Sequence, residues 1–262
     1  MNSTIFLKTK GGLCNRLRAI DSAIILSKKI DKKLIVIWEN NNDLGANFKD
    51  LFEDIKNVKI VAQCPKKLSF FLKKKTWLKH LNSTLVLNTE ITTLNIKLLF
   101  KSTTFLSELK TYRYIYFETE HAFLYPENFK MFKPLKVIQK IVNKNESLIG
   151  LHIRRTDHDF AKLNSPTELF IKTIKKELEQ NPTTKFYLAT DDLEIKSILM
   201  RMFKNKIITN NFELSRLSLN GAQNAVVDLF SLASCIKIYG SLGSSFSETA
   251  YHIGDNKLIL LK

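Results

Sequence analysis

The chain is poor in the residues that mark several protein classes. Its 262 residues include only three cysteines, Cys14, Cys64 and Cys235, which are scattered and odd in number. This argues against a disulfide framework or a zinc site and suits a reducing compartment. Eight glycines and five prolines are too few for a low-complexity chain. No apolar run is long enough to span a membrane, and residues 1–8 are expected to form a strand rather than a signal peptide.

Acidic residues are also scarce beside basic ones. The chain has 25 Asp and Glu residues against 41 Lys and Arg residues, which gives a net charge of +16 at pH 7. Such an excess favours anionic partners such as nucleotides, nucleic acids or anionic membranes. The alternative is that the positive net charge reflects only a compositional bias toward lysine. A hydrophobic content of 44% and a charged content of 25% are typical of a globular chain with one large or two small domains.

The order of the expected elements indicates an α/β fold. The chain opens with a strand, a turn that contains Gly11 and Gly12, a helix and a second strand, which form a βαβ unit. The second half alternates short apolar runs with helical periodicity, as a parallel sheet covered by helices does. A helix is expected at 134–144, and another opens with the capping box Ser165–Glu168. Strands are expected at 4–9, 34–38, 56–61, 114–117, 148–154, 185–190, 207–208, 236–240 and 258–261.

One stretch places a charge cluster directly after a buried strand. Residues Gly150–Asp157 read GLHIRRTD, so an apolar strand ends in an imidazole, two guanidiniums and a carboxylate. Ligands of open α/β sheets bind at this end of a strand, and a guanidinium fits two phosphate oxygens. Neighbouring strand residues point to opposite faces, so Arg154 and Arg155 can serve one ligand only where the strand has ended. The ligand-binding interpretation is favoured over a surface ion pair of Arg155 with Asp157.

Three further polar clusters are expected at the same edge of the sheet or on the helices that follow it. The turn Gly240–Ser245 is small and hydroxyl-rich and opens a helix, so it suits a diphosphate. Asp228 precedes this turn, and its carboxylate can accept the N1–H and N2–H of guanine. The third cluster is Thr190-Asp191-Asp192. Two alternatives stay open: Asp191-Asp192 is only a helix N-cap, and Asp228 is a solvated aspartate.

A metal site receives little support. Adjacent carboxylates can hold Mg²⁺ beside a diphosphate. The DxD arrangement of metal-dependent glycosyltransferases occurs only at 157–159, without a second supporting feature. We therefore expect no metal.

The segment 66–81 is basic and aromatic. On a helix its large apolar residues share one face and its lysines flank that face, so it could lie on a membrane surface. The alternative, a core-facing helix with a solvated basic side, is favoured.

Together these motifs resemble those of the fucosyltransferase superfamily, which includes α1,6-, nodulation-type, α1,2- and protein O-fucosyltransferases. The stretch Gly150–Asp157 resembles the first motif, HxRRxD, and Leu188–Asp192 resembles the second. Residues 227–233 with 240–250 are similar to the third. Gly11–Arg16 looks like the N-terminal glycine-rich loop, in which a glycine more often stands at the position of Cys14. The resemblance covers the second half and the first 30 residues.

The resemblance implies a GT-B-like α/β fold with two Rossmann-like domains whose parallel sheets face a cleft. Residues 1–145 would form the acceptor-side domain and residues 146–262 the donor-side domain. It also implies an inverting, metal-independent transfer of fucose, or of a related GDP-linked sugar, to a glycan hydroxyl, with the GDP-sugar as donor and no further cofactor.

The resemblance also assigns residues to roles. Arg154 and Arg155 would hold the β-phosphate, with Ser244 and Ser245 near the diphosphate. His152 and Asp228 would meet the guanine, and Asp191 belongs to the same donor site. From the N-terminal domain, Gly12, Asn15 and Arg16 would face the cleft. The sequence departs from the family pattern at the general base. Family members often place an acidic residue several positions after the first motif, and here Asp159 is the candidate.

Partners and location follow as expectations. The acceptor is a glycan, which can be lipid-linked, and the protein would act in the cytoplasm, at the inner face of the membrane if 66–81 touches it. The alternative function is a basic module that binds nucleic acid or nucleotide without transferase activity. The second half lacks the exposed stacking aromatics of common RNA binders, so no nucleic-acid partner is expected. The acceptor, its linkage, the sugar and the oligomeric state are left open.

Overall fold

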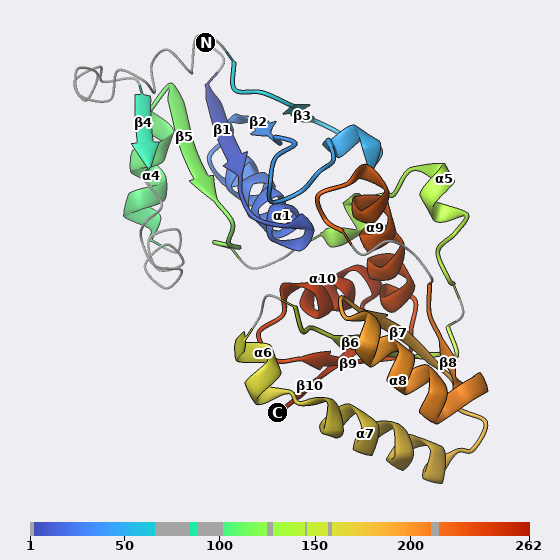
Figure 1. Ribbon diagram of the computed structural model, residues 1–262. Helices are drawn as coiled ribbons and strands as arrows, with labels where there is room; N and C mark the ends of the chain where they lie inside the picture. Colours follow the sequence, from blue (N-terminus) through green and yellow to red (C-terminus); the bar gives the residue numbers. More distant parts are fainter. Residues whose placement is uncertain are drawn as a thin grey trace. The chain divides into compact units, whose positions relative to one another are not determined.

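The computed structural model describes residues 3–65, 84–87, 102–124, 128–144, 146–156, 159–210 and 215–262. The chain forms two compact units (Figure 1). One comprises 1–133 with 216–222, and the other comprises 134–215 with 223–262. This division lies close to the expected one after residue 145, but a short later segment returns to the first unit. The segment 66–81, Asp157 and His158 lie outside the described residues.

The first unit is built on a five-stranded parallel sheet with the order β3-β2-β1-β5-β4. The central strand β1 places Ile5 opposite both Leu34 and Ile115, and all three are buried. The helix α1 follows β1 and packs against it. The strands are β1 (Thr4–Thr9), β2 (Lys33–Ile37), β3 (Val58–Val61), β4 (Thr84–Leu87) and β5 (Tyr114–Thr119). The helices are α1 (Leu13–Lys29), α4 (Thr103–Thr111) and the 3-10 turns η1 (Phe48–Asp50) and η2 (Phe129–Met131).

A return segment completes the first unit. The Gly45 N–H donates to the Arg216 carbonyl at 2.8 Å. A Cβ at position 45 would lie 2.0 Å from the Leu217 carbonyl oxygen, so only glycine allows this approach. The segment 216–222 is therefore held to the loop after β2 by backbone contacts.

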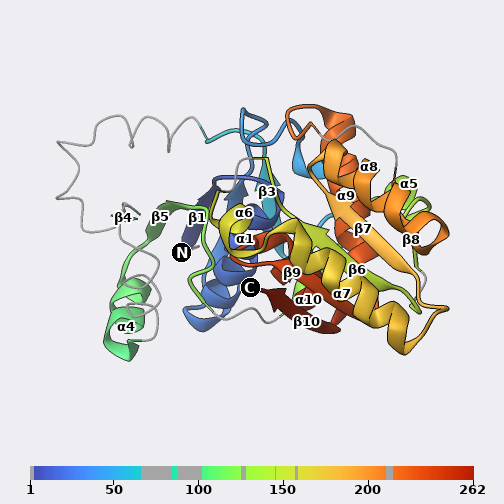
Figure 2. The same ribbon diagram turned by 60° about the horizontal axis from the view of Figure 1, so that its bottom comes forward.

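The second unit contains another five-stranded parallel sheet, with the order β10-β9-β6-β7-β8 (Figure 2). Its strands are β6 (Ile149–Ile153), β7 (Phe186–Thr190), β8 (Ile207–Ile208), β9 (Lys237–Ser241) and β10 (Lys257–Leu261). Its helices are α5 (Lys136–Gln139), α6 (Asp159–Asn164), α7 (Thr167–Gln180), α8 (Leu193–Phe203), η3 (Lys204–Lys206), α9 (Leu219–Ala233) and α10 (Ser245–Gly254). The first few residues of α9 belong to the segment that folds with the first unit.

Helices cover both faces of the second sheet, and β6 lies at its centre (Figure 1). Every residue of β6 is buried, as expected for a strand covered on both faces. Leu151 and Ile153 pack in the cluster that contains Phe170 of α7 and Leu199 of α8. Gly150 faces the other side, where an added Cβ would come within 3.0 Å of Leu232 on α9. The alternation of side chains along β6 therefore turns the next residue on that side, His152, toward the α9 and α10 face.

The expected strands of the second half are confirmed within a few residues, and two expectations for its helices are wrong. The helix expected at 134–144 is the short α5. The capping box at 165–168 does not form: Pro166 is the N-cap of α7 and makes no side-chain capping bond. The sequence also gave no indication of β4, α4 or α6.

None of the helices in the described part of the chain is both long and apolar enough to cross a membrane.

Candidate functional site

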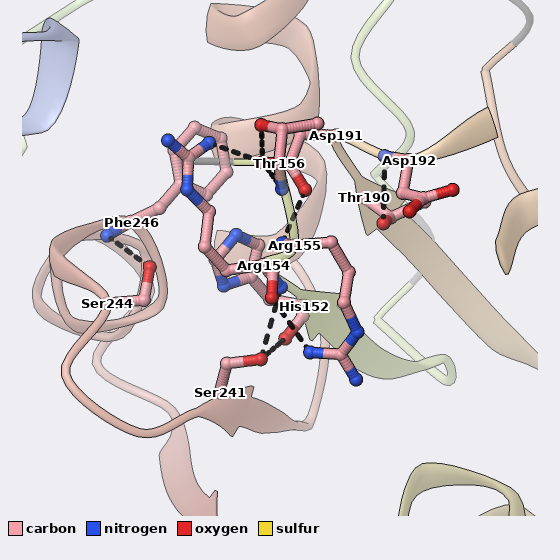
Figure 3. A network of polar contacts seen from close by, with 10 residues as sticks. All are labelled: His152, Arg154, Arg155, Thr156, Thr190, Asp191, Asp192, Ser241, Ser244 and Phe246. Atoms are coloured by element: carbon pink, nitrogen blue, oxygen red, sulfur yellow. Dashed lines mark hydrogen bonds and ion pairs between the residues drawn. The ribbon is translucent and has the colours of Figure 1, made fainter. Parts of the chain in front are cut away.

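The site is built around the turn that follows β6. The strand ends at Ile153, so Arg154 and Arg155 both lie where the backbone turns, as the sequence required. The Arg154 N–H donates to Ser241 Oγ at the end of β9, at 3.1 Å. The Arg155 N–H donates to Asp191 Oδ1 just after β7, at 2.8 Å (Figure 3). The turn is thus fixed to the ends of both neighbouring strands.

The two arginines point to different sides of this turn (Figure 3). Arg154 Nη1 forms an ion pair with Asp191 Oδ2 at 2.7 Å, and its side chain is 26% exposed. A guanidinium in this state is held in position but remains accessible to a ligand. Such an arrangement suits an anion, because the donor fork is placed before the ligand arrives.

Arg155 is bonded inside the protein, whereas the expectation was that it holds a phosphate. Arg155 is 7% exposed, and burial lowers the pKa of its guanidinium. Nη1 donates to the Arg154 carbonyl at 2.8 Å. Nη2 donates to the Ser165 carbonyl at 2.8 Å and to Thr167 Oγ1 at 3.1 Å. The planar fork that the sequence assigned to phosphate oxygens is therefore filled by protein oxygens.

The two adjacent aspartates after β7 have separate structural tasks. Asp191 Oδ1 receives the Arg155 N–H, while Oδ2 receives the Thr156 N–H at 3.2 Å and the Thr156 hydroxyl at 2.7 Å. Asp192 caps α8, since its Oδ1 accepts the first free backbone N–H groups of that helix at 2.9 and 3.0 Å. The N-cap alternative is thus correct for Asp192. Asp191 shapes the arginine turn and holds Arg154.

Ser165 joins two turns of the site, and the sequence analysis missed it. Its hydroxyl accepts the Leu242 N–H at 2.8 Å and donates to the Leu261 carbonyl at 2.5 Å. Its carbonyl receives Arg155 Nη2. The residue is fully buried. The turn after β6 and the turn after β9 are therefore linked through one serine.

The Ser/Gly turn lies at the end of β9 and opens α10, as expected. Gly243 has a φ of 75°, a conformation that favours glycine. Ser244 is the N-cap of α10, and its hydroxyl accepts the Phe246 N–H at 3.4 Å. Ser244 is buried and Ser245 is half-buried. The positive end of α10 thus meets the same edge of the sheet as the arginine turn, which suits an anion.

His152 is a neutral imidazole next to this turn. It is 5% exposed and stacks on Phe246, with ring centroids 4.9 Å apart. Burial lowers its pKa to about 3. Its Nδ1 is buried and has no hydrogen-bond partner. A buried N–H without an acceptor is costly, so we assign the hydrogen to Nε2, which makes this atom the donor.

Asp228 is a bonded carboxylate, so the solvated-aspartate alternative is wrong. It is half-buried on α9. Its Oδ1 accepts the Tyr187 hydroxyl at 2.7 Å and Asn210 Nδ2 at 2.9 Å. Burial raises its pKa. Tyr187 stands on β7 opposite Gly150, so this cluster lies on the same face of the sheet as His152.

The residues expected from the first unit lie at the start of α1: Gly12 is in the loop before the helix, and Asn15 and Arg16 are in its first turn. Gly11 has a φ of 72°, and Gly12 is the N-cap of α1. Asn15 Oδ1 accepts Arg18 Nη2 at 2.8 Å. Arg16 has no exposed surface, and burial lowers its pKa to about 10. Its nitrogens donate to Gly11 O at 2.8 Å, Glu39 O at 2.6 Å and Asn41 Oδ1 at 2.8 Å.

The expectation was that Arg16 faces the cleft, whereas its side chain is buried within the first unit. The guanidinium lies over the Trp38 ring at 5.0 Å and closes the glycine loop against the chain after β2. Arg16 thus stabilises the glycine loop through its hydrogen bond to Gly11.

Asp159 is the one expected catalytic residue that the structure leaves apart from this network. Its side chain is 97% exposed, and it pairs with Lys162 at 3.0 Å on the same short helix. The described residues also contain no cluster of three or more His, Cys, Asp or Glu side chains that could hold a metal ion.

No protein-family model matches the chain, and no curated protein sequence is significantly similar to it. Solved structures are similar over nearly the whole chain. One is NodZ α-1,6-fucosyltransferase, an enzyme from Bradyrhizobium, in a crystal soaked with GDP-fucose. It is 14% identical with a TM-score of 0.64, and the match covers 97% of this chain and 93% of NodZ. A variant of Arabidopsis thaliana FUT1 in complex with GDP is 12% identical with a TM-score of 0.66, over 99% and 70%.

A third similar structure is POFUT1 in complex with GDP-fucose, which is 11% identical with a TM-score of 0.61, over 99% of this chain and 98% of its own. The chain has the GT-B-like fold of these fucosyltransferases. The expected fold class is thereby confirmed. At this level of identity the likeness concerns the fold, so the chemistry must be argued from the residues of the site.

Proposed function

We propose that the protein is an inverting glycosyltransferase that transfers fucose, or a related GDP-linked sugar, from a GDP-sugar to a glycan hydroxyl. The observation that carries the proposal is the turn after β6, where Arg154 is held by Asp191 yet stays accessible, beside the N-terminus of α10. Three proteins of the same fold were crystallised with GDP or GDP-fucose, which supports this ligand class.

The diphosphate is assigned to Arg154 and the opening of α10. When the sugar leaves, the diphosphate gains negative charge, and a guanidinium and helix dipole already in place stabilise that charge without reorganisation. Ser244 and Ser245 contribute the capped helix end. Arg155 supports this site indirectly, because it fixes the backbone from which Arg154 projects.

The proposed reaction needs no metal. In sites that use Mg²⁺, carboxylate oxygens coordinate the ion beside the phosphates. Here Asp191 uses both oxygens for the arginine turn, and Asp192 caps α8. Arg154 supplies the positive charge instead.

Contacts to the guanine of GDP are assigned to His152 and Asp228. Guanine presents N1–H and N2–H donors on one edge and the O6 and N7 acceptors on another. A carboxylate matches the donors, and a neutral imidazole with its hydrogen on Nε2 matches an acceptor. The two side chains lie on the same face of the second sheet, as the proposal that one base contacts both requires.

The remaining assignments complete the proposal. Asp159 is kept as the general base, since an exposed carboxylate can accept the proton of an incoming hydroxyl. The acceptor is a glycan, which can be lipid-linked, and the protein would act at the cytoplasmic face of a membrane.

The test combines binding and turnover. In calorimetric titrations GDP should bind more tightly than ADP or UDP, by up to about 10⁴-fold, because a site built to pair buried polar groups rejects bases that leave them unpaired. Hydrolysis or transfer from a panel of GDP-sugars should identify the sugar and should persist in EDTA. Equal affinity for GDP and UDP would contradict the donor assignment. Loss of turnover in EDTA, restored by Mn²⁺ or Mg²⁺, would contradict the metal-independent mechanism.

A further inference from the structure

Three polar side chains from three elements of the second unit meet on the α9 side of the sheet. Tyr187 comes from β7, Asn210 follows β8 and Asp228 lies on α9. The Tyr187 hydroxyl donates to Asp228 Oδ1 at 2.7 Å, and Asn210 Nδ2 donates to the same oxygen at 2.9 Å. Asn210 Nδ2 also donates to the Tyr187 hydroxyl oxygen at 2.6 Å. Each member of the cluster therefore contacts the other two.

The arrangement fixes the orientation of the carboxylate. Because the three distances close a triangle, both donors approach Oδ1 from the same side. Rotation of the Asp228 side chain would break both hydrogen bonds at once. Oδ2 accepts no hydrogen bond from any residue that the structure describes. An ionised carboxylate can accept about four hydrogen bonds, so one edge of Asp228 is kept for other donors.

A fourth residue secures the cluster from the other face. The Lys196 side chain is buried, and its ammonium donates to the Asn210 carbonyl. Burial lowers the pKa of Lys196, and the charge of Asp228 opposes that shift. The lysine thus fixes the backbone of Asn210 and supplies a positive charge near the carboxylate. Tyr187 has no exposed surface, so its hydroxyl is fixed as well.

We infer that Tyr187 and Asn210 are positioning residues that hold the free edge of Asp228 toward guanine and so determine the preference for a guanine nucleotide. This inference rests on the proposed function, in which Asp228 accepts the N1–H and N2–H of the base. Two parallel donors require a carboxylate in one orientation, and the triangle provides that orientation before the nucleotide binds. A loosely held carboxylate would lose part of this discrimination.

The test uses inosine diphosphate, whose base keeps N1–H but lacks the 2-amino group. The variants are Tyr187→Phe, which removes only the hydroxyl, and Asn210→Ala. The matched control is Tyr239→Phe: Tyr239 lies on β9, which β6 separates from β7, and its hydroxyl donates to Glu177 on the α7 side of the sheet. Calorimetry measures the affinities for GDP, inosine diphosphate and UDP.

Tyr187→Phe and Asn210→Ala should each weaken GDP binding by about five- to tenfold, the effect of one lost hydrogen bond. The ratio of GDP to inosine diphosphate affinity should fall, UDP affinity should not change, and Tyr239→Phe should match the wild type. In turnover with a GDP-sugar, KM should rise while kcat stays close to that of the wild type.

The outcomes separate this inference from the proposed function. If Asp228→Ala loses the GDP preference while Tyr187→Phe and Asn210→Ala keep it, the positioning role is wrong and the guanine assignment stands. If the wild type itself shows no preference for GDP over UDP, the proposed function fails. Asn210 is half-buried, so Asn210→Ala decides the question if Tyr187→Phe does not fold.

Discussion

At the scale of single residues, the neighbouring arginines after β6 show how one motif serves two purposes. Arg154 is partly exposed and is held by the Asp191 carboxylate. Arg155 is buried, and its nitrogens contact two backbone carbonyls and a hydroxyl. The sequence alone treats them as equal phosphate ligands, because a guanidinium fork fits phosphate oxygens and carbonyl oxygens alike.

Substitution of each arginine by lysine should distinguish the roles of Arg154 and Arg155. Arg154→Lys should lower GDP affinity and transfer while the melting temperature stays close to the wild-type value. Arg155→Lys should lower transfer and also destabilise the fold by about 3 kcal/mol, since an ammonium cannot reach the three acceptors of a buried fork. Activity assays with thermal melts of both variants measure this. An Arg155→Lys protein that melts like the wild type would contradict the structural role.

His152 should make stability depend on pH. Its pKa is about 3 in the folded chain against 6.5 for an ordinary histidine, because burial disfavours the charged form. Below pH 6.5 the unfolded chain therefore binds a proton that the folded chain does not, and stability falls as the pH falls.

The expected loss from this one group is about 2 kcal/mol between about pH 7.5 and about pH 5. Urea unfolding of the wild type and of His152→Gln at several pH values measures it, and the variant should lack this increment. Equal slopes in the two proteins would show that His152 is not the source of the dependence.

At the scale of elements, Ser165 explains why two turns from distant parts of the sequence behave as one support. It bonds the backbone of the turn after β9, the end of β10 and Arg155. Sequence reasoning placed this serine in a capping box, because a Ser followed three residues later by Glu just before an apolar run is the usual signature. The hydroxyl instead satisfies backbone groups that only the folded sheet brings near.

Ser165→Ala should therefore cost more than the loss of one ordinary hydroxyl. It leaves the Leu242 N–H without its acceptor and should destabilise the second unit by about 1–3 kcal/mol. It should also weaken GDP binding, since both turns of the diphosphate site lose their link. Ser234→Ala is the control, because that hydroxyl, just after the end of α9, donates to the carbonyl of Phe230 one turn earlier. Melting and titration of both variants measure the difference, and equal effects would contradict the linking role.

At the scale of the whole molecule, the alternation of strands and helices was predictable, and the partners of buried charges were not. The apolar run at 148–153 and the glycine turn at 10–15 predicted β6 and the entry to α1, since their signals are local. Arg16 was assigned to the cleft and Arg155 to a phosphate, because their acceptors come from Glu39, Asn41 and Ser165, which are far from them or in unpredicted conformations. The elements β4 and α4 lie in the region whose pattern was least regular.

The return of residues 216–222 to the first unit has a consequence for how such a protein can be recombined. The chain changes unit after Lys133, after Ser215 and after Ala222. A single crossover near the middle of the gene would therefore give each product a first unit assembled from two parents. It would take from the first unit the segment whose Arg216 carbonyl bonds Gly45. Exchange of the second unit between two such proteins would therefore need two further junctions, so that residues 216–222 stay with the first unit to which they bond.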